Sequence, residues 1–318
     1  PMNFMYLILK TTVALILAAG GFALYLFTYL NESIEPTEKF VKIEKGSNQN
    51  ALESLSDIGI TTNIIDKITL RYLGGAKSGS ISLDGVNTRL SLLEAMVKGK
   101  SKSFSVTLIP GETTEIFLKT VAKEHNLSYD KLKAAYNDKT KAEEGELWPE
   151  TFSFEYGSDE KEIIGTFYDF SQKKYDEIKK EYSLDEKAFR QKLIIASIIE
   201  KEAATKDEMP LVASVVYNRI AKDMPLQMDG SLNYGSYSHQ KVTPERIRND
   251  DSSYNTYKNK GLPDAPVCNP SKEAIDAANK PAKTGYLYFM KNKNGVHDFS
   301  NSYNDHLRNI SNVKKSNK

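Results

Sequence analysis

The chain is poor in the residues that build metal sites and disulfides. Its 318 residues include one cysteine, Cys268, and four histidines that are scattered along the sequence. A single thiol excludes an internal disulfide and a cysteine-based zinc site. The histidines show no metal-ligand spacing, so we predict no metal and interpret them as packed or surface residues. The scarcity of thiols is typical of proteins from oxidising compartments.

The sequence also lacks an excess of charge of either sign. Its 43 Lys and Arg residues nearly balance 42 Asp and Glu residues, which leaves a formal net charge of +1. No global electrostatic field favours a nucleic acid, so we predict no nucleic-acid partner. The lysines in the C-terminal "SNVKKSNK" indicate a solvated tail.

What the sequence does have is one long uncharged apolar run, "TTVALILAAGGFALYLFTYLN", over residues 11–31. As a helix, these residues extend roughly 31 Å, the thickness of the hydrocarbon core of a bilayer. Lys10 precedes the run and Glu32 follows it, so the positive-inside rule places the N-terminus in the cytoplasm. We predict a single span at residues 1–31, with the remainder of the chain exported. A cleaved signal peptide is the alternative, and it also exports the rest.

The exported part reads as a linker and two domains, and the predicted fold class is α+β. Residues 32–39 are polar and contain a proline. Residues 40–104 predict a small α/β module with strands around Val41 and in "SISLDG", and with three helical segments. Residues 105–318 predict a mainly helical domain. It has a strand at 104–109, a helix capped by Thr113, an aromatic loop "EEGELWPETFSFEYG", and helices at 160–181, 185–205, 208–222 (capped by Asp207) and 271–280, followed by a strand "GYLYFM".

The helix predicted at 185–205 ends with two glutamates in "LIIASIIEKEA". At about 100° per residue, Glu202 falls at the centre of the stripe formed by Ile194, Ile195, Ile198 and Ile199, whereas Glu200 falls nearly opposite, on the polar side. A carboxylate on an apolar face has a raised pKa, and a protonated carboxyl is what protonation of a leaving-group oxygen requires. The alternative is that the helix ends before residue 202 and Glu202 faces water. The pattern alone therefore makes Glu202 a candidate general acid.

Several segments occur together in an order that resembles the bacterial endolytic murein transglycosylase family, also called YceG-like. They are "ASIIEKEA", "LVASVVYNRI", "MPLQMDGSLNYG", "YNTYKNKGLPDAPVCNPSKEAIDAANKPAKTGYLYF" and "HDFSNSYNDH". The resemblance covers most of the chain, including the apolar run, the small module and "EGELWPETF". It implies a lysin-motif-like module before a lysozyme-like catalytic domain. It also implies that the span lies in the bacterial inner (plasma) membrane, with the catalytic domain periplasmic or extracellular.

The resemblance also implies an activity and its residues. Glu202 corresponds to the family's catalytic acid in Glu-Lys-Glu, so the resemblance and the helical wheel select the same residue. The implied enzyme is a lyase that cleaves the MurNAc–GlcNAc bond of nascent peptidoglycan strands without water, leaves 1,6-anhydro-MurNAc ends, needs no cofactor, and works near the peptidoglycan synthases. The substrate-binding residues expected from the motifs are Asn218, Gln227, Asp229, Tyr254, Asn255 and Tyr257.

Two departures from the family pattern and several alternatives remain open. Ala203 stands where the family usually has Thr, and Gly230 stands where members often have Pro after Asp. Asn218 and Arg219 fit equally well as braces of their helix, and Asp229 as a turn former. Tyr254, Tyr257 and Trp148 also fit as packing residues. A muramidase-type hydrolase, which needs a second carboxylate, and a non-catalytic peptidoglycan-binding scaffold are the alternative functions.

Overall fold

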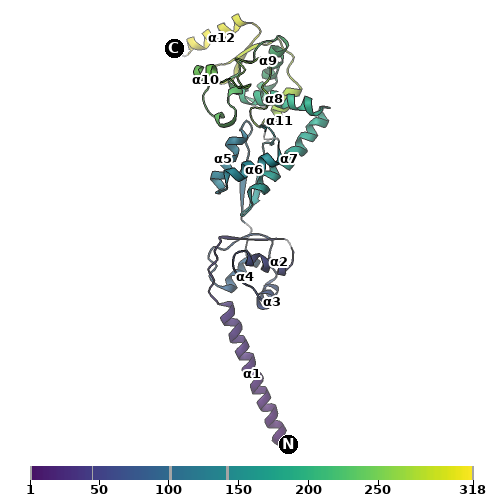
Figure 1. Ribbon diagram of the computed structural model, residues 1–318, viewed down its shortest axis with the longest axis vertical. Coiled ribbons are helices and arrows are strands. Elements are labelled where there is room, and N and C mark those ends of the chain that lie inside the picture. Colours follow the sequence, from purple (N-terminus) through teal and green to yellow (C-terminus); the bar gives the residue numbers. More distant parts are fainter. Residues whose placement is uncertain (1, 45, 100–101, 141–142, 317–318) are drawn as a thin grey trace. The chain divides into compact units, whose positions relative to one another are not determined.

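The computed structural model describes residues 2–44, 46–99, 102–140 and 143–316, except the side chains of residues 2, 3 and 316. The chain mixes helices and short sheets, and about 55% of it is helical. It divides into two compact units, residues 1–105 with 153–158 and residues 106–152 with 159–318 (Figure 1). The chain leaves the first unit within β3 (Ser103–Thr107) and returns to it within β4 (Thr151–Glu155).

The first unit begins with α1 (Met2–Leu30), in which Phe4–Leu30 is long and apolar enough to cross a membrane. A signal sequence near an N-terminus has the same length and composition. A small module follows, with the order β1 (Phe40–Ile43), α2 (Asn48–Ser56), α3 (Ile64–Leu73), β2 (Gly79–Ser82) and α4 (Arg89–Lys98).

The predicted strands and helices of this module are confirmed. β1 and β2 pair antiparallel with Val41 opposite Ile81, and both side chains lie in the module's core. Gly74 ends α3 in the left-handed conformation, with φ of 112°, which a residue without a Cβ adopts without strain. Gly99 follows the last residue of α4, as predicted.

The second unit is mainly helical. Its elements are α5 (Thr114–His125), α6 (Tyr129–Lys139), α7 (Glu160–Glu181), α8 (Glu186–Glu202), α9 (Met209–Ala221), α10 (Pro244–Asn249), α11 (Lys272–Asn279), β5 (Tyr288–Lys291), β6 (His297–Ser300) and α12 (Tyr303–Ser316). Short 3-10 turns lie at Lys206–Glu208, Asp229–Leu232 (η2) and Gly235–Tyr237.

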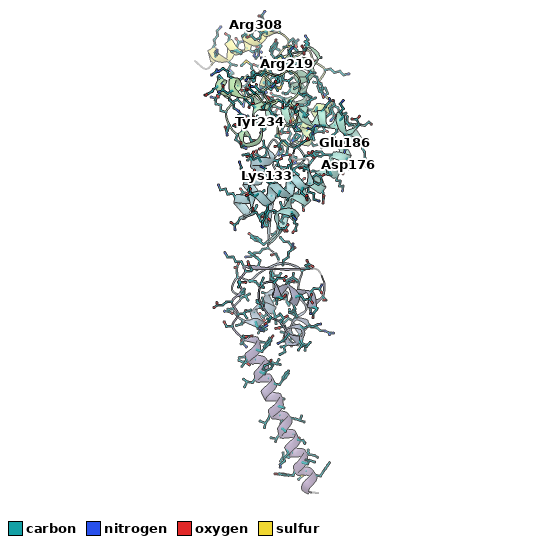
Figure 2. The ribbon with its side chains drawn as sticks, viewed as in Figure 1. Lys133, Asp176, Glu186, Arg219, Tyr234 and Arg308 are labelled. Carbon is teal, nitrogen blue, oxygen red and sulfur yellow. The ribbon has the colours of Figure 1, made fainter. Side chains whose placement is uncertain are left out.

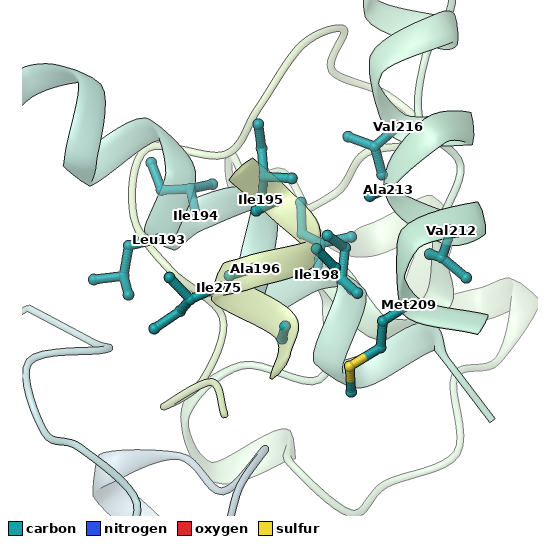
Figure 3. Close-up of a cluster of buried hydrophobic side chains, with 14 of the residues drawn as sticks. Leu193, Ile194, Ile195, Ala196, Ile198, Met209, Val212, Ala213, Val216 and Ile275 are labelled. Atoms are coloured by element: carbon teal, nitrogen blue, oxygen red, sulfur yellow. The ribbon is translucent and has the colours of Figure 1, made fainter. Parts of the chain in front are cut away.

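The core of this unit forms where α8, α9 and α11 meet. Apolar side chains of α8 interdigitate with those of α9, including Val212 and Val216, and with Ile275 of α11 (Figure 3). Burial of each such side chain contributes about 1.5–3 kcal/mol to folding, so this cluster holds the C-terminal end of α8 in place. Trp148 is 8% exposed and its ring lies 5.8 Å from that of Tyr175, which makes it a core residue.

Four sequence-based expectations about this unit are wrong. The segment predicted as a loop around "ETFSFE" contains β4, in which Phe154 is buried. The C-terminal residues predicted as a solvated tail are largely exposed, but they form part of α12 as far as Ser316, and residues 317–318 lie outside the described part. Asp207 does not cap α9, because it lies within a 3-10 turn that precedes the helix. The helix predicted to reach residue 205 ends at Glu202, since Ala203 is extended, with φ of −67° and ψ of 132°.

Candidate active site

The C-terminal end of α8 carries the candidate acid. Residues 193–199 are buried without interruption, and Ile198 and Ile199 have no exposed surface. Glu202, the last residue of the helix, follows on the face of Ile198 and Ile199, as the helical wheel predicts. Its side chain is partly buried and lines a pocket of about 170 Å³. The alternative in which the helix ends before Glu202 and leaves it in bulk water is wrong.

Glu200 points elsewhere. Its carboxylate accepts hydrogen bonds from the backbone N–H of Ser271, at 2.9 Å, and from the Ser271 hydroxyl. Ser271 is the N-cap of α11, where a negative charge is favourable because the first N–H groups of a helix point at it. Glu200 is therefore not the simple solvated residue that the wheel suggests. It ties the end of α8 to the start of α11.

The pocket around Glu202 is built by four segments of the chain besides α8: α9, residues 226–229, the loop of Tyr257, and β5. Its lining residues are Glu202, Arg219, Leu226, Gln227, Met228, Asp229, Tyr257 and Phe289. Burial raises the pKa of Glu202 from an ordinary value of 4.5 to about 7, a hydrogen bond from Gly230 lowers it, and the charge of Asp229 raises it. Part of the side chain still faces the pocket, while the surrounding protein removes most of the water that would stabilise the charged form. At neutral pH the carboxyl is thus close to half protonated.

Gly230 contacts the acid through its backbone. Its N–H donates to Oε1 of Glu202 at 2.7 Å. A Cβ at this position would lie 2.7 Å from Cβ of Lys201 and 2.9 Å from Oε1 of Glu202, so a larger residue forces the two segments apart. Close approach is therefore the reason for glycine here. Proline, expected at this position from the family pattern, has no N–H to donate.

Three of the predicted binding residues meet in this pocket. The Tyr257 hydroxyl donates to Oδ1 of Asp229 at 2.7 Å, which joins two loops that are distant in sequence. Gln227 adopts the left-handed conformation, with φ of 50°, and its N–H donates to the carbonyl of Thr256 at 3.0 Å. Gln227, Asp229 and Tyr257 are thus held beside Glu202, and Asp229 supplies a second carboxyl group.

Arg219 is a pocket residue that sequence reasoning interpreted only as a possible brace. Its side chain is buried and donates to three carbonyls, those of Leu287 at 2.7 Å, Leu226 at 2.7 Å and Pro225 at 3.1 Å. It therefore braces the loop that carries Gln227 and Asp229. Its position next to Asn218 in "YNRI" is the sequence signal that indicates it.

The two predicted asparagines, Asn218 and Asn255, do not line the pocket around Glu202. The amide of Asn218 donates to the carbonyls of Thr284 and Tyr286, both at 2.9 Å. Asn255 has no exposed surface, and its amide donates to the carbonyls of Ile247 and Asp250 at 2.8 and 2.7 Å. Both side chains hold loops by satisfying backbone groups.

Tyr254 lines a second pocket, of about 320 Å³, and its ring stacks on that of Tyr234 with a centroid distance of 4.3 Å. Tyr234 and Lys133, both labelled in Figure 2, line this pocket together with Glu144. Burial raises the pKa of Glu144 to about 7, but its carboxylate already accepts hydrogen bonds from the N–H and hydroxyl of Thr114. The same two segments supply residues to both pockets: Asp229 and Tyr257 line the pocket of Glu202, whereas Tyr234, Gly235 and Tyr254 line the second one.

The pocket can donate a proton at neutral pH. Glu202 is a carboxyl with a pKa near 7, and its geometry is fixed by a buried helix and one backbone donor. Among the residues that the structure describes, no group of three or more His, Cys, Asp or Glu side chains is placed to hold a metal ion.

A family model and the named relatives of this chain agree with one another. A sequence model of the YceG-like family matches residues 41–312. A Bacillus subtilis protein named endolytic murein transglycosylase is 28% identical over 316 residues, which cover 88% of each chain. A Streptococcus pneumoniae protein of the same name is 32% identical over 173 residues, 52% of this chain and 31% of that one.

Solved structures include a related fold. The 2.6 Å crystal structure of a yceG-like protein from Listeria monocytogenes has a TM-score of 0.56 and 28% sequence identity, and the match covers 87% of this chain and 99% of that one. Because the family match extends over most of the sequence, from the small module to α12, the chain belongs to the YceG-like family.

Proposed function

We propose that this protein is an endolytic peptidoglycan lytic transglycosylase, a lyase that cleaves the MurNAc–GlcNAc bond within glycan strands. Relatives from two organisms carry the name endolytic murein transglycosylase. The observation that carries the proposal is Glu202, a carboxyl that lines a pocket and whose pKa burial raises to about 7.

The proposed reaction needs one acid that later acts as a base. Protonated Glu202 donates its proton to the glycosidic oxygen as the bond from that oxygen to C1 of MurNAc breaks. The 6-hydroxyl of the same MurNAc then attacks C1 and passes its proton to the Glu202 carboxylate, which regenerates the acid. No water is consumed, and the intramolecular attack supplies a high effective concentration of the nucleophile. The products are a 1,6-anhydro-MurNAc end and a free hydroxyl on the departing sugar.

Residue roles follow from position. Glu202 is the proposed catalytic residue. Gln227, Asp229 and Tyr257 contact the sugars next to the cleaved bond, where a partial positive charge develops on the ring and favours polar and anionic neighbours. Tyr254 binds a sugar further along the strand, with its ring as an apolar platform in the second pocket. Asn218 and Asn255 act as positioning residues, through the loops that they hold.

The proposal extends to location and organisation. α1 is a single membrane anchor with the N-terminus in the cytoplasm, supported by the apolar Phe4–Leu30 segment and by Lys10 before its centre. The domain boundaries are residues 1–31, 32–39, 40–104 and 105–318. The 40–104 module is lysin-motif-like, which its order of strand, two helices and antiparallel strand supports. The 105–318 domain is lysozyme-like, and the enzyme acts beside the peptidoglycan synthases to terminate or trim strands.

The proposal is tested by the mass of the products. Purified full-length protein is incubated with uncrosslinked glycan strands, and the new ends are analysed by mass spectrometry. Anhydro ends, lighter by one water than hydrolysed ends, are expected. Glu202→Gln abolishes them, while Glu200→Gln, a change on the same helix that lies outside the pocket, retains them. Full activity in Glu202→Gln would remove the assignment of the acid.

Muramidase-type hydrolysis is the second candidate function, and Asp229 is the observation that favours it. A hydrolase needs a second carboxylate, and Asp229 shares the pocket with Glu202. Hydrated ends in the same assay would replace the lyase assignment with this one. Binding to glycan without any cleavage would instead support the non-catalytic scaffold.

A further inference from the structure

The small module carries an exposed apolar stripe on α3. Ile64, Ile68 and Tyr72 are 65%, 62% and 90% exposed. Their spacing of four residues places them on one face of the helix, opposite the buried Asp66 and Leu70. Among the described residues of 32–99, no other large hydrophobic side chain is exposed. Such a stripe on an otherwise polar module indicates a contact surface.

α3 begins beside the last turns of α1. The residues just before α3, Thr61 to Asn63, line a pocket together with Tyr25 and Thr28 of α1. The apolar segment Phe4–Leu30 is 27 residues long, which is roughly 40 Å of helix and exceeds the roughly 30 Å hydrocarbon core of a bilayer. Its last turns therefore reach the headgroup region, where tyrosines are favoured. The start of α3 is held at that same depth.

A partly buried polar network fixes this arrangement. The Tyr29 hydroxyl donates to Oδ2 of Asp66 at 2.7 Å, and the Asp66 side chain also accepts the N–H of Asn63 at 2.8 Å. Arg89, the first residue of α4, donates to Glu32 at 2.9 Å, and its guanidinium lies 4.5 Å from the centre of the Tyr29 ring. The end of α1 and the starts of α3 and α4 are thus joined by charge-assisted bonds.

The charges beside the stripe fit a lipid surface. Lys67 and Arg71 are exposed and lie next to Ile64 on the helical wheel. An apolar face bordered by basic residues is the pattern of helices that lie in a membrane interface, where cations meet anionic headgroups. In Figure 1, α3 lies at the edge of the module from which α1 emerges.

We propose that the membrane itself covers this stripe: α3 rests on the outer leaflet, with Ile64, Ile68 and Tyr72 inserted among the headgroups beside the α1 span. The small module is then fixed to the bilayer surface and does not move freely on a tether. This inference rests on the proposed anchoring of α1 in a membrane, and it is independent of the proposed lyase activity.

Tryptophan quenching by brominated lipids tests the inference on the full-length protein in liposomes. Bromine on acyl chains quenches only those tryptophans that contact the lipid. Trp148 is buried in the second unit and gives a constant background, which the unmodified protein measures. Three variants add one tryptophan each: Ile68→Trp on the stripe, Glu53→Trp on the exposed surface of α2 as the matched control, and Phe22→Trp within the apolar segment of α1.

The expected result is about a twofold or greater loss of the added fluorescence for Ile68→Trp, strongest with bromines near the headgroup, and no loss for Glu53→Trp. Quenching of Phe22→Trp reports separately whether α1 spans the membrane, because Phe22 lies about 12 Å along the helix from Leu30, towards the centre of the bilayer. Quenched Phe22→Trp with unquenched Ile68→Trp overturns the inference and assigns the stripe to a protein partner. Unquenched Phe22→Trp overturns the membrane anchor. Equal quenching of Ile68→Trp and Glu53→Trp also overturns the inference about α3, since the whole module would then contact lipid without preference.

Discussion

Replacing Glu202 with glutamine is expected to stabilise the protein in alkaline solution while abolishing its activity. Burial raises the pKa of the Glu202 carboxyl to about 7, so the folded protein holds this proton more tightly than the unfolded chain does. Between pH 4.5 and 7 the folded state therefore binds more protons, and its stability falls as pH rises through this window. Below pH 4.5 the contribution is fully present, and above about pH 8 it has been lost.

The size of the effect follows from the two pKa values. The difference between 4.5 and about 7 corresponds to roughly 3 kcal/mol, and solvent access through the pocket reduces it towards about 2 kcal/mol. Glutamine does not titrate, and its side-chain oxygen can still accept the N–H of Gly230. The variant should thus match the unmodified protein near pH 4.5 and exceed its stability by about 2–3 kcal/mol at pH 8.

Urea unfolding of both full-length proteins in detergent, at pH 5 and pH 8, measures this difference. The fluorescence of Trp148 reports the relevant unit, because this sole tryptophan lies in the same core as α8. Comparing two proteins at one pH cancels the other titrating groups. A stability difference that is the same at both pH values would refute the burial argument. So would a lyase activity whose pH profile shows no decline with an apparent pKa near 7.

Four further changes test the neighbourhood of the acid. Gly230→Ala introduces a Cβ into a space where contacts would be 2.7–2.9 Å, so activity should fall at least about tenfold in the product assay while the fold persists in circular dichroism. Asp229→Asn removes a charge that raises the pKa of Glu202, so the decline in activity should move to lower pH in a rate profile. Arg219→Ala leaves two buried carbonyls and one partly buried carbonyl without their donor and should cost about 2–4 kcal/mol in urea unfolding. Glu200→Gln weakens the interaction of α8 with the cap of α11, so it should lower the free energy of unfolding by about 1 kcal/mol while activity is retained. Loss of activity in this variant would contradict the assignment of Glu202 as the sole catalytic acid.

Local sequence signals predicted the elements that depend on local chemistry. The helix expected at 160–181 is α7, with the same bounds, because its buried stripe repeats at helical spacing. Thr113 caps α5 by accepting the N–H of Ile116, as its position before an amphipathic run predicts. The direction of Glu202 also followed from periodicity, since the two preceding turns of α8 carry Ile194, Ile195, Ile198 and Ile199 on the same side.

The missed elements depend on partners that are distant in the sequence. β6 has the sequence "HDFS", and only its pairing with β5 makes it a strand. α12 is an exception: it is polar over most of its length, but Leu307, Ile310 and Val313 repeat at helical spacing, a local pattern that the interpretation as a tail overlooked. In the site, the bond from Gly230 to Glu202 joins residues 28 positions apart, and the bracing role of Arg219 requires carbonyls that approach it only in the fold. The sequence motif suggested that the Asn255 amide binds the ligand, but this buried amide instead donates a hydrogen bond to the backbone of its own loop.

The segment from Gln227 to Gly230 both shapes the pocket and controls its acid. Gly230 donates the one backbone hydrogen bond that lowers the pKa of Glu202, while Asp229 beside it raises that pKa. Arg219 donates to the carbonyl of Leu226, just before this segment, and the Tyr257 hydroxyl donates to Asp229 within it. A residue without an N–H at position 230 would remove the bond that stabilises the charged carboxylate, and the acid would stay protonated to higher pH. Because a Cβ at position 230 would lie 2.7 Å from Lys201 and 2.9 Å from Glu202, glycine is what lets this N–H approach the carboxyl, and it thereby biases the acid towards releasing its proton at lower pH.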